Sequence, residues 1–202
     1  MNQTKVQFSN SERELMCNSE VILTKNKVIQ KIKTLLEELQ NDLTTNCEAN
    51  SKLLSNEIFS IHPKISKGEN YQGLPYLILD YPRVFKQEDI FAIRTMFWWG
   101  NFFSTTLHIS GLFKLQYAQN IIASFSILTS EGFSVGINTD PWLHHFGADN
   151  YRQIASMNEK MFQEECNKQA HLKIAKTISL NESNVSEKIS ESWKLLTEIC
   201  FH

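Results

Sequence analysis

Hydrophobic residues recur at helical spacing through the first quarter of the chain. Between residues 11 and 58 the apolar positions follow one another three or four residues apart, and charged or polar residues fill the other positions. This spacing forms one apolar stripe on an α-helix. The clearest members of the stripe are Val28, Ile32, Leu35, Leu36, Leu39 and Leu43. Its period is not that of a sustained heptad, so we expect a long helix packed on a sheet rather than a coiled-coil seam.

The same reading sets the expected domain organisation. We expect residues 1–10 to be flexible and a second helix to cover about residues 47–58. Residues 11–58 would then be a helical segment packed on the rest of a single domain, residues 1–202. Residues 62–73 hold one proline, two glycines and several polar residues, which is typical of a loop.

The strongest pattern lies at residues 90–111, where two runs rich in Phe, Ile, Trp, Thr and Leu flank a Gly-Asn pair. Glycine followed by asparagine suits a two-residue type II′ turn, which predicts a β-hairpin. Such a turn pairs Trp99 with Phe102 and Thr95 with Thr106. A slip of one residue would reverse the assignment of side chains to the two faces.

The other segments complete a mixed order of elements. Strands are predicted over residues 74–83, 133–137 and 171–180, and helices after Gly111, over residues 150–169 and at the C-terminus. Asp140 is placed to cap a helix that begins at Pro141. The order predicts an α+β fold. We expect a small antiparallel or mixed sheet around the central hairpin (about residues 90–110), packed against several helices.

Alternation along the hairpin separates an almost wholly apolar face from a mixed one. The apolar face, expected under the helices, holds Ile90, Ala92, Arg94, Met96, Trp98, Phe103, Thr105, Leu107 and Ile109. The mixed face has aromatic side chains near the turn and hydroxyl and imidazole groups further away, the composition of a small-molecule pocket. A half-exposed or covered sheet face has the same composition. The predicted ligand-binding residues are Thr95, Phe97, Trp99, Thr106 and His108, with Tyr71 on a loop that could close over them.

Arg94 is the exception on the face expected to be apolar. A buried guanidinium needs an acidic partner, because an unpaired buried charge is very costly. Asp80 on the preceding strand is the nearest expected partner, with Glu69 and Asp89 as alternatives. An ion pair inside the fold and an anion-binding role are both compatible with the sequence.

Composition restricts the partners. The net charge is −2 with a pI near 6.3 and no Arg-rich run, whereas nucleic-acid binding normally needs a basic face, so we expect no nucleic-acid partner. Apolar runs fall short of the roughly 18–20 residues of a membrane span, so we expect no membrane partner. A polar start, "MNQTKVQFSN", and four scattered cysteines without ligand spacing point to the cytoplasm.

Motifs for metals, cofactors and catalysis are missing from the sequence. The adjacent His144 and His145 lack HExxH or other ligand spacing, and neither GxSxG nor a phosphate-binding glycine pattern occurs. We therefore expect no metal and no cofactor, and an enzyme is not indicated.

Two segments resemble a known group of proteins. At "KGENYQGLPYLILDYPR" and "IFAIRTMFWWGNFFSTTLHISG" the chain is similar to a family of similarly sized bacterial hypothetical proteins. The resemblance covers about residues 67–111, and it implies no activity, cofactor or catalytic residue.

Three hypotheses about function remain open. The preferred one is a cytoplasmic module that binds a small, partly apolar ligand on the mixed face of the hairpin. The second is a structural or interaction protein that forms a homo-oligomer such as a homodimer, with its aromatic patch at the interface. The third is an enzyme that uses His108 as general acid or base.

Overall fold

The computed structural model describes residues 6–49 and 56–201. These residues form an α+β fold around one antiparallel seven-stranded sheet of order β1-β2-β3-β4-β7-β5-β6. The strands are β1 (Lys64–Tyr71), β2 (Leu74–Phe85), β3 (Ile90–Trp98), β4 (Phe102–Ser110), β5 (Ser134–Gly136), β6 (Tyr151–Gln153) and β7 (His171–Ser179). The hairpin β3–β4 lies at the centre, as predicted, and the fold class is confirmed.

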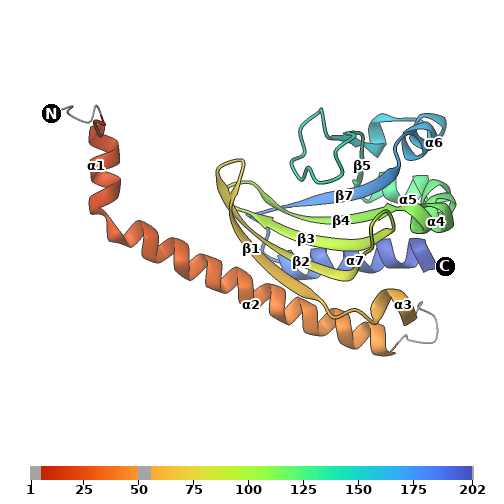
Figure 1. Ribbon diagram of the computed structural model, residues 1–202, viewed down its shortest axis with the longest axis horizontal. Helices are drawn as coiled ribbons and strands as arrows, with labels where there is room; N and C mark the ends of the chain where they lie inside the picture. Colours follow the sequence, from red (N-terminus) through yellow and green to blue (C-terminus); the bar gives the residue numbers. More distant parts are fainter. Residues whose placement is uncertain (1–5, 50–55, 202) are drawn as a thin grey trace.

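Helices pack on one face of this sheet, which we call the helix face. They are α2 (Ser19–Ala49), α3 (Asn56–Phe59), α4 (Gly111–Ala123), α5 (Phe125–Ser130), α6 (Glu159–Lys168) and α7 (Val185–Phe201), with a 3-10 turn at Ile154–Ser156. A further helix, α1 (Asn10–Cys17), precedes them and has no buried residue. Figure 1 shows α7 along the back of the sheet and α2 along its β1–β2 side. The core between them joins sheet residues such as Phe91 and Leu107 to Leu36 and Trp193 from the helices.

The long N-terminal helix packs on the sheet over only part of its length. Leu36, Leu39 and Leu43 are buried in the core, which confirms the predicted packing for the second half of α2. The first turns of α2, up to residue 24, and all of α1 extend away from the sheet (Figure 1). Ser9 begins α1 with a capping box to Glu12. The predicted helix over residues 47–58 lies partly outside the described residues.

The loop predicted at residues 62–73 is wrong, because most of it is strand β1. This strand lies at the edge of the sheet and pairs only with β2. An edge strand tolerates polar residues better than a central one does, so it lacks a strong apolar pattern. Gly68 leaves room for the Tyr76 ring, because a Cβ at this position would stand 2.3 Å from it and the ring would have to move. The turn is confined to Gln72 and Gly73, both with positive φ.

The hairpin register predicted from a two-residue turn is wrong by one residue. Trp98, not Trp99, pairs with Phe102, and Thr95 pairs with Thr105. The turn holds three residues, Trp99 to Asn101, and the Asn101 N–H donates to the Trp98 carbonyl. The shift leaves the predicted faces of β4 unchanged and reverses those of β3, so that Phe91 and Phe97 face the helices and Arg94 faces away from them.

Two helix predictions also need correction. Asp140 caps no helix: its Oδ1 accepts from the Trp142 N–H inside an irregular loop, residues 137–150. The helix predicted over residues 150–169 is β6, a 3-10 turn and then α6, which Asn158 caps by accepting from the Met161 N–H. The strands predicted at residues 74–83, 133–137 and 171–180, the helix after Gly111 and the C-terminal helix are confirmed.

Candidate functional site

The face of the sheet opposite the helices is covered in part by the loop of residues 137–150, and we call it the loop face. Arg94 from β3, Thr106 and His108 from β4, and Lys173 from β7 share it by register. A connection of this length without secondary structure is uncommon and usually functional. We therefore expect a functional site on the loop face.

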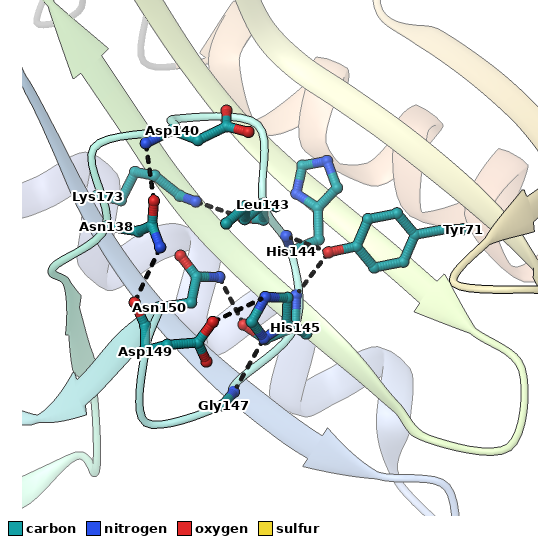
Figure 2. Close-up of polar contacts among 10 residues, drawn as sticks. All are labelled: Tyr71, Asn138, Asp140, Leu143, His144, His145, Gly147, Asp149, Asn150 and Lys173. Atoms are coloured by element: carbon teal, nitrogen blue, oxygen red, sulfur yellow. Dashed lines mark hydrogen bonds and ion pairs between the residues drawn. The ribbon is translucent and has the colours of Figure 1, made fainter.

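Three side chains of the sheet region and the loop hold this cover in place (Figure 2). The Tyr71 hydroxyl accepts from the backbone N–H groups of His144 at 2.7 Å and His145 at 3.0 Å. The Lys173 ammonium donates to the Leu143 carbonyl at 2.5 Å. Asn150 donates to the His145 carbonyl at 2.6 Å. These bonds satisfy loop backbone groups that would otherwise be unpaired, and so fix the loop over β3 and β4.

Arg94 occupies the centre of the site, and its predicted ion pair with Asp80 is confirmed. The guanidinium donates from Nε to Asp80 Oδ1 at 2.7 Å and from Nη2 to Oδ2 at 2.9 Å, a bidentate pair. Its Nη1 lies 3.1 Å from His144 Nε2. The two alternative partners bind elsewhere, with Glu69 paired to Lys25 and Asp89 accepting from the Leu112 N–H. Because three hydrogen bonds to Asp80 and His144 fix Arg94, its orientation is set before any ligand arrives.

A pocket of about 390 Å³ opens beside this ion pair. It is lined by Ser66, Tyr71, Tyr76, Ile78, Asp80, Arg94, Trp142 and His144. Trp142, which comes from the loop, is half-exposed. Aromatic walls with a few fixed polar groups are typical of small-molecule sites, whose volumes are roughly 300–1,000 Å³. A larger hollow of about 600 Å³ lies on α6, but it is lined only by polar side chains such as Gln163 and Lys168, so we favour the pocket at Arg94.

Burial and neighbouring cations keep His108, His144 and His171 neutral near neutral pH. Burial, followed by the charges of Lys173 and Arg94 among others, lowers the pKa of His108 and of His144 to about 3. Burial and Lys173 lower the pKa of His171 to about 4. Neutral His144 is therefore able to accept a hydrogen bond from Arg94 at Nε2.

Lys173 is a buried cation on the same face. Its side chain is 2% exposed, and its ammonium lies over the Tyr151 ring at 4.8 Å from the centroid. Burial and the charge of Arg94 lower its pKa to about 8. The Tyr151 hydroxyl forms a hydrogen bond with the Thr106 side chain, and burial raises the pKa of Tyr151.

Lys173→Met is expected to change how stability depends on alkaline pH. The pKa of Lys173 is lower in the folded state than its ordinary 10.5, so between pH 8 and 10.5 the unfolded state binds more protons and the free energy of unfolding rises with pH. The difference corresponds to about 3 kcal/mol across the full window. Urea denaturation of wild type and Lys173→Met at successive pH values above 8 measures it. Curves that stay parallel over that range would contradict the assignment.

The six residues predicted for the site divide between the two faces. Thr106, His108 and Tyr71 lie on the loop face, although only Tyr71 lines the pocket. Thr95 and Phe97 are buried on the helix face, because of the register shift, and Trp99 packs beside Phe97 at the turn. The structure therefore places only three of the six predicted ligand-binding residues on the loop face.

The residues that sequence reasoning missed come from three separate parts of the chain. Asp80 and Arg94 had been assigned to an internal ion pair, while Tyr76, Trp142 and His144 had no role as ligand-binding residues. The available signal was the charge of Arg94 on a β-strand. With the correct register, that charge places the polar site on the loop face.

His108, the residue of the enzyme hypothesis, lies beneath Trp142. Its ring centroid is 5.5 Å from that of Trp142 and 5.8 Å from that of His171. Its Nε2 is buried and has no hydrogen-bond partner among the described residues. A neutral, enclosed imidazole with a pKa of about 3 is poorly matched to proton transfer near neutral pH.

Metal-ligand clusters and membrane-spanning helices are both absent from the described residues. Over residues 6–49 and 56–201, no group of three His, Cys, Asp or Glu side chains is arranged to hold a metal ion. In the same residues, every helix is too short or too polar to cross a bilayer.

Comparison with known proteins adds no assignment to this geometry. No protein-family model, no curated protein and no solved structure matches the chain.

Proposed function

We propose that the protein is a binding module for a small, partly apolar molecule, which occupies the pocket between β2, β3 and the loop of residues 137–150. One observation carries the proposal: the Arg94 guanidinium, held by Asp80 and His144, lies in the wall of an otherwise largely aromatic pocket. The proposal keeps the preferred hypothesis from sequence, a small-molecule site on one face of the hairpin. It places that site on the loop face with a different set of residues.

The hydrogen-bond inventory indicates the polar part of the ligand. Arg94 has five N–H donors, and three of them are directed at Asp80 and His144. The Tyr71 hydroxyl accepts two backbone bonds and keeps its own proton to donate. The pocket therefore offers donors to a ligand that carries a carbonyl or carboxylate oxygen.

The walls indicate the rest of the ligand. Tyr76, Trp142 and Ile78 present rings and a branched aliphatic side chain, which favour a flat apolar body. Tyr71 packs edge-on against Tyr76 with centroids 6.2 Å apart and against Trp98 at 5.1 Å. Such packing restricts the rings before binding, which lowers the entropic cost of association.

The alternatives receive less support from the geometry. The rings of the aromatic patch contact one another or the core, with Trp98 against Phe102 and Phe102 against Phe146, so little of the patch is free for an interface. The enzyme hypothesis rests on His108, whose burial disfavours acid–base work. The cytoplasm is the compartment we propose, because free Cys17, Cys166 and Cys200 suit reducing conditions.

A thermal-shift screen of aromatic and heteroaromatic carboxylates and amides tests the proposal. We expect compounds that bind with Kd in about the micromolar range. Ser66→Tyr, which places a ring inside the pocket, should weaken their binding by more than about tenfold. Trp142→Ala should weaken it by about tenfold, since one wall is lost.

Ser66→Ala is the matched control, because it changes the same position and leaves the pocket open. It should bind the compounds as wild type does. Binding that survives Ser66→Tyr unchanged, or a screen in which nothing binds more tightly than about 1 mM, would show that this pocket is not a ligand site.

A further inference from the structure

The N-terminal end of the described chain forms an arm whose apolar side chains are exposed. The arm consists of α1 and the first turns of α2, residues 10–24, and every residue in it is exposed (Figure 1). Its large hydrophobic side chains are 41–66% exposed, and they are Leu15, Met16, Val21, Ile22 and Leu23. Contact with the body begins at Lys25, which pairs with Glu69 of β1.

Such an arm is unfavourable for an isolated chain. Helices shorter than about 12–15 residues are marginal in water, and most helix stability in proteins comes from packing of an apolar face. A run of consecutive exposed apolar residues such as Val21, Ile22 and Leu23 is a defect unless it has a partner. We therefore expect the arm to have a binding partner that covers its apolar side chains.

The distribution of charged residues along the arm indicates which partner binds it. Residues 10–20 carry three carboxylates and one guanidinium, whereas residues 21–33 carry four lysines and no acid. Glu14, Glu20, Lys27 and Lys31 have no ion-pair partner within the described residues. Asn18 interrupts the helix, and α1 turns away from the axis of α2 (Figure 1). Two copies of the start of α2 side by side in opposite directions bring Glu20 of each near Lys27 of the other, whereas a parallel pair would oppose like charges.

We infer that the binding partner is a second copy of this chain, whose arm packs antiparallel on the first around a two-fold axis near Ile22. Ile22 then faces Ile22 of the other copy, and Val21 of one lies near Leu23 of the other. Glu20 of one copy then lies near Lys27 of the other. The inference is independent of the proposed ligand pocket, which lies on the loop face.

The size of the contact predicts its strength. Helices rise about 1.5 Å per residue, so a paired segment of this kind is only a few tens of ångströms long. It buries less than the roughly 1,600 Å² of a standard interface. We therefore expect a dissociation constant in about the micromolar range rather than an obligate dimer.

Sedimentation velocity over about 5–200 µM tests the inference on the full chain. Wild type is expected to shift from monomer to dimer over this range. Ile22→Glu, which puts a charge at the axis, should weaken dimerisation by more than about tenfold. Leu115→Glu is the matched control, since Leu115 is 81% exposed on a helix of the body, and it should dimerise as wild type does.

Charge exchange and cross-linking test the antiparallel arrangement. Glu20→Lys and Lys27→Glu should each dimerise less than wild type, and an equal mixture of the two should recover dimers. In a Cys17→Ser background, Ile22→Cys should form a disulfide-linked dimer, whereas the native Cys17, away from the axis, should not in the otherwise unchanged chain. Efficient cross-linking through Cys17 indicates parallel arms and overturns the arrangement.

A wild-type chain that remains monomeric over the whole concentration range overturns the inference of a second copy, and the arm then serves a different protein or a lipid surface. Equal weakening by Leu115→Glu and Ile22→Glu also overturns it, because the contact would then not be specific to the arm. Far-UV circular dichroism of each variant confirms that the body is folded.

Discussion

Replacing Asp80 by alanine is expected to lower the free energy of unfolding by about 3–5 kcal/mol. The Asp80 side chain is 8% exposed and that of Arg94 16%, so the substitution leaves a mostly buried guanidinium without its counter-charge. His144 is neutral and accepts one bond, but it cannot replace two carboxylate oxygens. Urea denaturation followed by circular dichroism at neutral pH measures the effect.

An exposed ion pair supplies the control for this experiment. Glu57 pairs with Lys86 at 2.8 Å, and both side chains are more than half exposed; such pairs contribute about 0–1 kcal/mol. Glu57→Ala should therefore change stability little. The double variant Asp80→Leu/Arg94→Leu should recover much of the loss, because apolar replacement of a buried pair is often neutral. Equal costs for Asp80→Ala and Glu57→Ala would contradict the assigned role of the buried pair.

Acidification should destabilise the protein steeply, and His108 should account for a defined part of the loss. Its pKa falls from the ordinary 6.5 to about 3 in the folded state, so below pH 6.5 the unfolded state takes up a proton that the folded state does not. The stability is complete above pH 6.5 and is lost as the pH falls toward 3. The contribution of one such group approaches about 1.4 kcal/mol per pH unit inside this window.

His108→Leu isolates that contribution. Since His144 and His171 also have lowered pKa values, and carboxylates such as Glu69 titrate in acid, only the difference between variants is informative. The stability of His108→Leu, measured by urea denaturation from pH 7 to 4, should fall less steeply than that of wild type. The matched variant His62→Leu, at an exposed position, should follow wild type. Identical slopes for wild type and His108→Leu would rule out a buried neutral His108.

The fold could be predicted from sequence where local pattern and burial agree. The central hairpin, β2, β7 and α7 have strong alternating or helical patterns because each has an apolar side in the core. Strand β1 lacks such a pattern, since it lies at the sheet edge and is stabilised mainly by backbone bonds to β2. The packing of α2 was predictable from its stripe, but the point at which α2 leaves the body depends on where the sheet ends.

The site could be predicted only in part, because it depends on register and on non-local contacts. One extra residue in the hairpin turn moves Arg94 onto the loop face and Thr95 and Phe97 into the core. The loop of residues 137–150 is fixed by Tyr71 and Lys173, which are far from it in sequence. By contrast, the Asp80–Arg94 pair was predictable, since the cost of an unpaired buried charge restricts the partner to a nearby acid.

The most direct test of the proposed ligand site is an NMR titration of a compound from the screen into ¹⁵N-labelled protein. We expect the side-chain signals of Arg94 Nε–H and the Trp142 indole N–H to shift together and saturate with one Kd. The indole N–H of Trp193, which is buried and bonded to the Tyr81 carbonyl at 2.7 Å, should stay in place. Saturating shifts confined to other surfaces, such as the hollow around Lys114 and Ala118, with Arg94 and Trp142 unmoved, would contradict the central claim.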